Sequence, residues 1–420
     1  MISFWKKDKE SMVQKVLFLN TVAGKGSVGR IVTGLASALR DRGTDSLIAF
    51  GRWDAPENFN TYRIGNDTDV YLHGALSRIT DKHGLYSKGP TEKLISKIRQ
   101  YDPDIIHIHN VHGYYVNYKV LFSFLKNEFS ADPDHRIIWT LHDCWSFTGH
   151  CVHFEYAGCE KWKTGCFNCP EKDQYPRSFL MDSSGSNYEL KKECFTGIRN
   201  LTVVTPSEWL RSRVKESFMK EYPVETIPTG IDLNVFKPTG SGLRERYALS
   251  DKKILLGVAN PWRDRKGLGD FIELARQTGD DKAIVMIGLN RRQAGIMSKY
   301  KNVIPVMKTD SVQEMAEWYS TADIYVNLTR EDTFPTTNIE AMACGTPVIT
   351  YRAGGSPESL TDETGIVTAE NNISCVMESV EKLLSKDRDE VRKACIKRAQ
   401  SYGAETRFLS YIEKVYEKVL

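Results

Sequence analysis

Short apolar segments that favour strands alternate with helical segments along almost the whole chain, and this alternation limits the folds open to it. The segment KVLFLN (15–20) is predicted to be a buried strand, and a glycine-rich turn after it leads into the helical pattern RIVTGLASALRDRG. Buried strands separated by helices predict a parallel sheet covered by helices on both faces. Further strands of this kind are predicted at DSLIAF, DIIHIH, RIIWTLH, LTVVTPS and VETIPT.

The same alternation restarts after a segment rich in Gly, Pro and polar residues at 227–242. A chain of 420 residues is too long for one ordinary core, so we expect two doubly wound, Rossmann-like α/β domains. They are predicted at 12–222 and 223–402, with their carboxyl-terminal strand edges facing a common cleft, and a last helix at 403–420 is expected to cross back to the first domain. The second set of strands is predicted at KILLGVAN, KAIVMIG, NVIPVMK, DIYVNLT and TPVITY.

Composition excludes several classes of protein. Hydrophobic residues make up 41% and charged residues 26%, which is typical of a globular protein, and a net charge of +3 is too small to indicate nucleic-acid binding. No apolar run is long enough to span a bilayer, and the start MISFWKKDKESM lacks the apolar segment of a signal peptide. We therefore expect a soluble cytoplasmic protein, in which FWKK and the modest positive charge fit peripheral contact with the inner face of the cytoplasmic membrane.

The segment TREDTFPTTNIEAMACGTPVI (329–349) carries the most chemical information. A strand is predicted to end at its start and a helix to begin near Thr336 or Thr337, where backbone amides form a natural site for a diphosphate. The carboxylate of Glu340, one turn later, suits the two hydroxyls of a ribose. The alternative is a capped helix whose carboxylates are merely solvated.

This segment resembles the donor-site motif of the retaining glycosyltransferases of family four, which have the GT-B fold. In that family two glutamates flank seven residues; here Asp332 takes the place of the first glutamate, since Glu331 comes one residue too early. Phe334 and Pro335 match the aromatic-plus-small turn of the motif. Other matches extend over nearly the whole chain: the glycine-rich first loop, TLHD (140–143), TPSEWL (205–210), TGID (229–232) and RKG (265–267). The pair WTLHDCWSFTGHC and GCEKWKTGCFNCP resembles the bacterial surface-polysaccharide branch typified by the colanic acid glycosyltransferases.

The resemblance implies a set of donor-binding residues. Lys266 matches the phosphate-binding lysine, and fixed cations of this kind stabilise a departing diphosphate. The arginine that usually stands about six residues earlier is Asn260 here, so Arg263 or Arg265 is expected to supply the guanidinium.

Five further residues complete the expected donor side. The resemblance places Glu340 on the nucleotide ribose and Asp332 on the hydroxyls of the transferred sugar, while the expected helix amino end puts Thr336 and Thr337 at the diphosphate. Gly288 either lets the donor approach the backbone closely or forms a structural tight turn.

In the first domain the resemblance places Gly26 and Gly29 under the diphosphate and beside the acceptor. His142 matches the active-site histidine of the family, and Asp143 either orients it or caps a helix. His109 and His112 are expected to line the acceptor side, unless they are ordinary loop histidines. The family is thought to retain configuration by front-side attack, with the departing phosphate as base, so we expect no enzyme base and no catalytic divalent metal.

Five of the nine cysteines fall within an insert at 144–170. Four of them, Cys151, Cys159, Cys166 and Cys169, have the spacing C-x7-C-x6-C-x2-C, and the last pair has the spacing of structural zinc sites. Cytoplasmic thiols stay reduced, so we expect these four thiolates to bind a structural zinc. They would fill its tetrahedral coordination shell and leave no open position for catalysis. Cys144, His150 or His153 could replace one ligand; the alternatives are reduced cysteines packed as small apolar groups and, third, disulfides.

The expected activity is transfer of a sugar from a nucleoside-diphosphate sugar to a lipid-linked saccharide during bacterial capsule, exopolysaccharide or O-antigen assembly. A sugar-nucleotide epimerase or hydrolase with the same fold would need no acceptor. A non-catalytic, zinc-stabilised sugar-binding protein is the remaining alternative.

Overall fold

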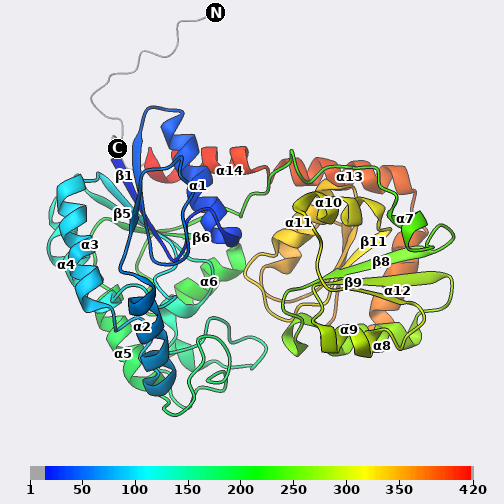
Figure 1. Cartoon of the computed structure of the whole chain (residues 1–420), viewed down its shortest axis with the longest axis horizontal. Coiled ribbons are helices and arrows are strands. Elements are labelled where there is room, and N and C mark those ends of the chain that lie inside the picture. The colour runs from blue at the N-terminus through cyan, green and yellow to red at the C-terminus, as the bar shows by residue number, and fades with distance from the viewer. Residues whose placement is uncertain (1–14, 418–420) are drawn as a thin grey trace, which may run out of the picture. The chain divides into compact units, whose positions relative to one another are not determined.

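Within residues 15–417, the part of the chain that this computed structural model describes, every strand runs parallel to its neighbours in one of two sheets. The chain divides into two compact units (Figure 1). The first comprises the chain up to Ile227 together with the segment from Arg407 onward, and the second runs from Pro228 to Thr406. Two parallel sheets flanked by helices confirm the predicted α/β fold class.

The first sheet has seven strands in the order β3-β2-β1-β4-β5-β6-β7. Its strands are β1 (Lys15–Asn20), β2 (Asp45–Phe50), β3 (Thr61–Arg63), β4 (Ile105–Ile108), β5 (Arg136–Thr140), β6 (Leu201–Thr205) and β7 (Val224–Thr226). The helices of this unit are α1 (Gly26–Arg40), α2 (Asp67–Thr80), α3 (Lys88–Tyr101), α4 (Tyr118–Asn127), α5 (Ser184–Phe195) and α6 (Glu208–Glu216). Its short 3-10 turns are η1 (Phe129–Ala131), η2 (Trp145–Phe147) and η3 (Lys161–Lys163).

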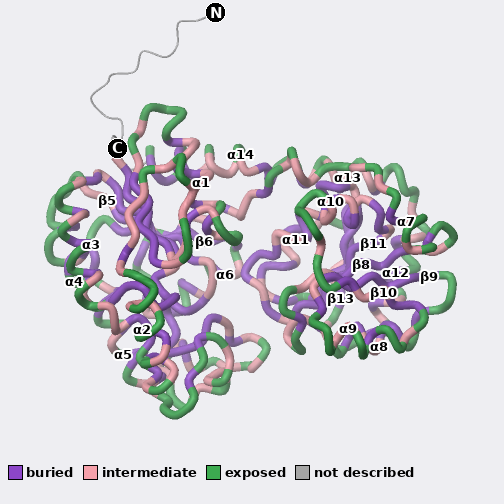
Figure 2. The backbone as a smooth tube through the Cα atoms, viewed as in Figure 1, coloured by how far each residue is buried: buried purple, intermediate pink, exposed green. Residues whose placement is uncertain are grey.

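The first sheet is buried on both faces, as the strand β1 illustrates. Val16 and Phe18 pack in one core cluster, whereas Leu17 and Leu19 pack in another, because successive side chains of a strand point to opposite faces. All four side chains are fully buried, and Figure 2 shows the strands as a buried interior. Burial on both faces explains why the strand sequences are continuously apolar.

The last residues that the structure describes, 407–417, lie in the first unit. Helix α14 (Ala404–Tyr411) leads into a π-helical turn, η6 (Ile412–Tyr416), and Tyr411, Ile412, Val415 and Tyr416 join the same core cluster as Val16 and Phe18. The hydroxyl of Tyr416 lies 2.6 Å from Nδ1 of the buried His107. The last turns of the chain thus close one face of the first sheet.

The second sheet has six strands in the order β10-β9-β8-β11-β12-β13. These are β8 (Lys253–Val258), β9 (Lys282–Ile287), β10 (Val303–Val306), β11 (Ile324–Asn327), β12 (Val348–Tyr351) and β13 (Gly365–Thr368). The helices are α7 (Leu243–Arg246), α8 (Leu268–Gln277), α9 (Arg291–Met297), α10 (Val312–Thr321), α11 (Thr336–Ala343), α12 (Ile373–Leu384) and α13 (Arg388–Gln400), with 3-10 turns at η4 (Asp264–Lys266) and η5 (Ser356–Ser359).

In each sheet the strand order reverses at one point, between β1 and β4 in the first and between β8 and β11 in the second. Open parallel sheets bind ligands beyond the carboxyl ends of the strands at such a switch point. The loops after β1, β4, β8 and β11 are therefore the places where each unit can form a site.

Candidate active site

Three consecutive residues in the loop after β11, 330–332, form ion pairs with the segment 264–270, which follows β8. We call these three ion pairs the ion-pair ladder, and each pair is one rung of it. At the end of this ladder, Nζ of Lys266 lies 2.9 Å from Oδ2 of Asp332, and both side chains are part-buried. Oδ1 of Asp332 also accepts a hydrogen bond from the backbone N–H of Phe334 at 3.2 Å. The two residues predicted to act on the diphosphate and the sugar are thus direct neighbours at the switch point of the second sheet.

The other two rungs of the ladder were not predicted from the sequence. Glu331 is 2% exposed and accepts from Nη1 of Arg265 at 2.8 Å. Arg330 donates through one nitrogen to both carboxylate oxygens of Asp270, at 2.8 and 2.7 Å. Glu331 therefore fixes the loop in place, and the guanidinium of Arg265 is engaged in the ion pair with Glu331.

Helix α11 begins directly after this ladder. Pro335 stands at its N-cap, and no side chain caps its amino end. Glu340, one turn into the helix, is held by two hydroxyls: Tyr319 donates to Oε2 at 3.1 Å and Thr336 to Oε1 at 3.3 Å. The carboxylate predicted to hold a ribose therefore has a fixed position beside an uncapped helix amino end.

Two glycines of the second unit allow close backbone contacts. A Cβ at Gly354 (φ +53°) would lie 1.9 Å from the carbonyl oxygen of Asp332. Only glycine therefore fits at position 354, where the chain packs against the backbone of Asp332. A Cβ at Gly288 (φ +94°) would lie 2.0 Å from the carbonyl oxygen of Ala259. The contact at Gly288 is with the neighbouring strand end, which accounts for this glycine as a tight structural turn.

The remaining predicted donor residues lie in the same loops. Arg263 is exposed at the start of η4, and Asn260 is exposed before it. Phe334 is 5% exposed and belongs to the core cluster of this unit, with its ring 5.7 Å from that of Tyr402. Phe334 and Pro335 therefore fix the start of α11 from inside, while Arg263 faces solvent.

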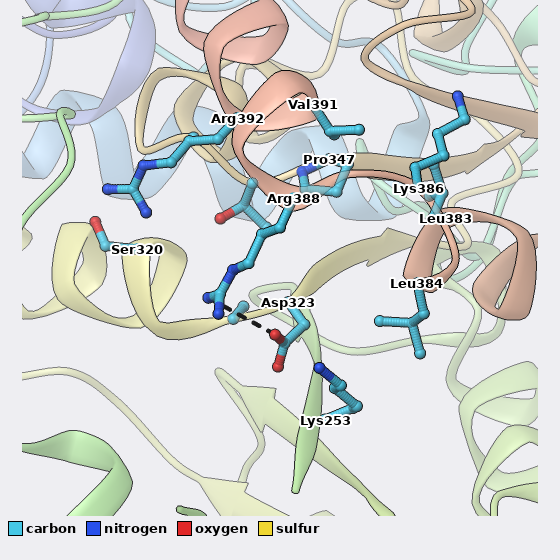
Figure 3. A pocket seen from close by; sticks show the side chains of 13 residues that line it. Lys253, Ser320, Asp323, Pro347, Leu383, Leu384, Lys386, Arg388, Val391 and Arg392 are labelled. Atoms are coloured by element: carbon cyan, nitrogen blue, oxygen red, sulfur yellow. Dashed lines mark ion pairs between the residues drawn. The ribbon is translucent and has the colours of Figure 1, made fainter.

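A separate pocket in the second unit lies at the opposite edge of the sheet (Figure 3). It holds about 60 Å³ and is lined by Lys253, Asp323 and Pro347, which come at the amino ends of β8, β11 and β12. Asp323 pairs with Arg388 at 3.7 Å in this pocket and with Arg244 at 2.8 Å. This pocket is too small for a sugar nucleotide and is not the donor site.

In the first unit two predicted histidines meet at the carboxyl edge of the sheet. β4 and β5 pair with Ile108 opposite Trp139, so the residues that follow each strand emerge side by side. Nδ1 of His109 lies 2.9 Å from Nε2 of His142, and their rings are stacked with centroids 5.2 Å apart. His109 stacks in turn on His107, 4.3 Å away.

A second pair lies beside the first. Nε2 of His112 is 2.8 Å from Oδ2 of Asp143, and Nδ1 of His112 is 3.0 Å from the hydroxyl of Tyr175. The other oxygen of Asp143 accepts from the N–H of Trp145 at 2.9 Å. Asp143 therefore orients His112 and caps the short turn η2, while the hydrogen-bonding neighbour of His142 is His109. His109, His112, His142 and Asp143 line one small hollow of about 10 Å³.

Burial sets the protonation of these groups. It lowers the pKa of His142 to about 4 and that of His107 to about 3, and it holds the pKa of His109 well below its usual range. Burial by itself would raise the pKa of Asp143, but the neighbouring His112 and the N–H of Trp145 outweigh it and lower this pKa to about 2. At neutral pH His142 is a neutral ring that can both donate and accept a hydrogen bond, beside an ionised Asp143.

The two predicted glycines of the first loop shape the start of α1. Gly26 (φ +66°) is the first residue of the helix, and no side chain caps its amino end. Gly29 is buried, and the N–H of Gly24 donates to its carbonyl oxygen at 3.0 Å. The loop after β1 is thus a tight turn that leaves a second uncapped helix amino end at the switch point of the first sheet.

The cysteine-rich insert packs on the first core. Cys151 is 6% exposed, and its thiol shares a hydrogen bond with that of Cys169, which raises the pKa of Cys151 and lowers that of Cys169 to about 7. Sγ of Cys166 accepts from the N–H of Gly149 at 3.2 Å, and charge interactions couple this thiol to Cys159 and Cys169. Among residues 15–417 no group of three or more His, Cys, Asp or Glu side chains is arranged to hold a metal ion. Zinc at these thiols stays a prediction.

Sequence reasoning missed the residue that fastens this insert to helix α5. Lys191 of α5 is 1% exposed, and its Nζ donates to the carbonyl oxygens of Trp145 at 2.7 Å and Thr148 at 2.9 Å. Its ammonium lies 3.3 Å from the centre of the Trp145 ring, and burial lowers its pKa to about 7. The segment KKECF (191–195) carries no pattern that would have revealed this role.

Comparison with known proteins identifies the class. Residues 28–235 match the model of Glycosyltransferase Family 4, and residues 242–402 match that of Glycosyl transferases group 1. One match falls on each parallel-sheet unit. The chain belongs to the glycosyltransferases, in the two-domain GT-B class.

Individual relatives are distant. The chain is 26% identical over 277 residues to the putative colanic acid biosynthesis glycosyl transferase WcaC of Escherichia coli, a match that covers 64% of this chain and 65% of that protein. It is 25% identical over 229 residues to a GDP-mannose-dependent monoacylated alpha-(1-6)-phosphatidylinositol monomannoside mannosyltransferase of Corynebacterium glutamicum, covering 50% of this chain and 58% of that protein. The chain thus spans less than two thirds of the length of these curated relatives.

A solved structure shares the whole fold. Anabaena Alr3699/HepE in complex with UDP superposes with a TM-score of 0.66 over 96% of this chain and 99% of its own, at 15% sequence identity. This likeness supports the GT-B architecture.

Proposed function

We propose that this chain is a retaining glycosyltransferase that moves a sugar from a nucleoside-diphosphate sugar to a lipid-linked saccharide in bacterial surface-polysaccharide assembly. The observation that carries the proposal is the Lys266–Asp332 pair beside the uncapped amino end of α11, at the switch point of the second sheet. A cation and a helix amino end together suit a diphosphate, which no neutral sugar site requires.

Donor binding would divide the ion pair between two parts of the ligand. Lys266 would turn to the diphosphate, whose negative charge grows as it leaves, and Arg263 would add a second cation from η4. Asp332 would be released to accept hydrogen bonds from hydroxyls of the transferred sugar. Opening the pair on binding costs little, because each charged group exchanges one charged partner for another polar one.

Glu340 would hold the nucleotide. Its two oxygens are oriented by Tyr319 and Thr336, so the carboxylate is positioned before a ribose arrives. Two adjacent hydroxyls can donate to one carboxylate, and this geometry favours a ribose with a free 2′ and 3′ hydroxyl. The UDP bound to the HepE structure is consistent with a donor of this class.

The first unit would serve the acceptor. His142 and His109 are neutral at physiological pH, and Asp143 and His112 form a charged or strongly polar pair beside them. Neutral imidazoles can bond hydroxyls as donors or acceptors without becoming general bases. The hydroxyl proton would pass to the departing phosphate during front-side attack, so that the configuration at the anomeric carbon is retained. The relative from Corynebacterium glutamicum is a mannosyltransferase for a phosphatidylinositol monomannoside, a saccharide carried by lipid, and this supports an acceptor of the same kind. The amino-terminal FWKK, which the sequence favours for membrane contact, lies outside the described residues.

The test is product analysis with a panel of labelled sugar nucleotides and a lipid-linked acceptor extracted from bacterial membranes. We expect label from one nucleotide to move to the lipid fraction, with the anomeric configuration of the donor kept. Conversion of the donor without acceptor would indicate an epimerase, and release of free sugar a hydrolase. An inverted product, or no turnover of any sugar nucleotide, would reject the proposal.

A further inference from the structure

The last described turn of the chain contacts a histidine within the first sheet. Tyr416 is 1% exposed, and its hydroxyl lies 2.6 Å from Nδ1 of His107 on β4, although 309 positions separate the two residues. Tyr416 packs in the core cluster that also contains Val16 and Phe18, at the red end of the chain in Figure 1. Phenylalanine would fill the same space, so what tyrosine adds at this position is the bond to His107.

Both ring nitrogens of His107 have partners. Nε2 lies 2.8 Å from Oγ1 of Thr140 on the neighbouring strand β5, and burial keeps the ring neutral by lowering its pKa to about 3. A neutral imidazole offers one donor and one acceptor. Within residues 15–417 the hydroxyl of Tyr416 has Nδ1 of His107 as its hydrogen-bond partner, and a buried donor left unpaired is costly. Tyr416 therefore donates to Nδ1, and Nε2–H of the ring donates to Thr140, so the plane of the ring is fixed from both sides.

The ring of His107 supports the next histidine. Its centroid lies 4.3 Å from that of His109, and the two planes are 29° apart. Nδ1 of His109 lies 2.9 Å from Nε2 of His142, whereas the buried Nε2 of His109 has no hydrogen-bond partner within residues 15–417. Phe18 is more distant, with its ring 6.3 Å from that of His109. Because no second hydrogen bond fixes the ring of His109, its stacking on His107 sets its plane, and the bond to Nε2 passes this orientation on to His142.

We propose that Tyr416 is a positioning residue, which acts through His107 and His109 to hold the ring of His142 in the orientation that binds the acceptor hydroxyl. The role of His142 at the acceptor rests on the proposed function, whereas the positioning of its ring does not. All four residues belong to the first unit. Loss of the Tyr416 hydroxyl should therefore change the use of the acceptor and leave the binding of the nucleotide by the second unit as it is.

The first test is nuclear magnetic resonance of the full chain, labelled with nitrogen-15 in its histidine rings, without any substrate. We expect His107 to carry its proton on Nε2, and we expect Tyr416→Phe to shift the ring signals of His109 and His142, which the variants His109→Gln and His142→Gln assign. Thr140→Val removes the other partner of His107 and should shift the same signals. Tyr416→Phe and Thr140→Val each replace one buried polar group by an apolar group of nearly the same shape, so these two variants should fold.

The second test is transfer kinetics with the lipid-linked acceptor. Tyr416→Phe should lower kcat by about tenfold or more, because small displacements of the groups that hold the reactants lower rates steeply. The affinity for UDP, GDP or ADP, whichever the parent binds, should stay at the parent value. A purely structural role of the hydroxyl would lower the stability of the protein without separating these two quantities.

Tyr222→Phe is the matched control. Tyr222 is 8% exposed in the same unit, and its hydroxyl donates to the carbonyl oxygen of Phe195 at 2.8 Å and accepts from the N–H of Ile198 at 3.0 Å. This variant should lower the midpoint of thermal unfolding, as Tyr416→Phe does, and leave the imidazole signals and kcat at parent values.

Unmoved signals of His109 and His142 in Tyr416→Phe would overturn the proposal, and so would an unchanged kcat. An equal loss of kcat in Tyr222→Phe would overturn it too, because the effect would then come from general destabilisation. A parent that transfers no sugar would reject the proposed function, while the spectra would still decide whether Tyr416 positions His142.

Discussion

Lys266 and Asp332 hold each other 2.9 Å apart, and each is the nearest charged partner that the structure gives the other. In the proposed function this pair is the point at which the enzyme contacts the donor. Glu340 differs, because its partners Tyr319 and Thr336 are neutral hydroxyls that orient it. Substitutions at these positions should therefore affect donor use more than folding.

Lys266→Ala is expected to lower kcat/KM for the sugar nucleotide by roughly ten- to a hundredfold, since a charge-assisted hydrogen bond contributes about 1.5–3 kcal/mol. Lys266→Arg keeps the charge and should recover part of the loss. Arg276→Ala on α8 removes a cation that is 60% exposed and serves as the control. Steady-state kinetics with parent-like values for Lys266→Ala would remove this residue from the donor site.

The stacked histidines make the first unit sensitive to acid. His107, His109 and His142 stay neutral in the folded chain because burial lowers their pKa values, whereas in the unfolded chain they bind protons near pH 6.5. The unfolded state then binds more protons, so the free energy of unfolding falls as the pH drops from 6.5 toward 4 and is flat with respect to these groups above 6.5. His107 alone contributes about 1.4 kcal/mol per pH unit over this window.

Urea unfolding at pH 7, 6 and 5 measures this slope, and proton NMR identifies its source. Of the nine histidines, these three should show ring protons that do not shift between pH 8 and 5, together with His73 and His83, whose pKa values burial also lowers. If all nine titrate near pH 6.5, the buried stack is incorrect.

At the scale of elements, the ion-pair ladder fixes the loop after β11 to the start of α8. Arg330 and Asp270 form one of its ion pairs, with side chains that are only 15 and 11% exposed. Removing the arginine leaves a carboxylate that is buried without its charged partner, and this is costly in a low-dielectric interior.

Arg330→Met should destabilise the second unit by about 3 kcal/mol. The double variant Arg330→Met with Asp270→Leu should regain much of this loss, because it leaves no buried charge. Denaturant unfolding, followed by tryptophan fluorescence, measures the free energy of unfolding of both variants. If the losses of the two single substitutions add up in the double variant, the two residues act independently.

The cysteine insert is the other element with a specific chemical prediction. If Cys151, Cys159, Cys166 and Cys169 hold zinc, protein purified without a metal-affinity tag should contain about one equivalent that resists dialysis. Chelation should loosen residues 144–170 without unfolding the two units, because each unit has its own core, although metal binding and local folding are coupled. Activity should fall with the metal, since Lys191 fastens this insert next to His142 through Trp145 and Thr148.

Cys166→Ser and Cys169→Ser should reproduce this loss, whereas Cys375→Ser on α12 should not. Four titratable thiols in a metal-free, fully active protein would leave the cluster as packing alone. Nδ1 of His150 is paired with Asp81, and its Nε2 is buried without a hydrogen-bond partner. Zinc binding would account for this buried nitrogen, so a metal-free cluster would leave it in need of another explanation.

At the scale of the whole molecule, the architecture could be predicted because its signal is local. Continuous apolar strands such as KVLFLN and KAIVMIG are buried on both faces, and their predicted positions match β1 and β9. The short edge strands β3 and β13 were missed, because TYR and GIVT are too short and only half-buried to show a pattern.

The chemistry of the site was less predictable where it depends on contacts between distant parts of the chain. Asp332 and Glu340 could be found from their spacing, but 66 residues separate Glu331 from Arg265, and no periodicity connects them. Tyr319 lies 21 residues from the carboxylate it orients. Asp143 was placed beside His142 by sequence adjacency, whereas folding brings it to His112, 31 residues away.

The proposed function requires the second unit to bind a nucleoside-diphosphate sugar through Lys266 and Glu340. Isothermal titration of the parent protein with UDP, GDP and ADP, and of the variants Lys266→Ala and Glu340→Gln with whichever binds, tests it most directly. We expect one of these diphosphates to bind the parent at a stoichiometry of one, and each variant to weaken its binding about tenfold or more, equivalent to about 1.4 kcal/mol. No binding of any diphosphate by the folded parent, or equal affinity in parent and variants, would contradict it.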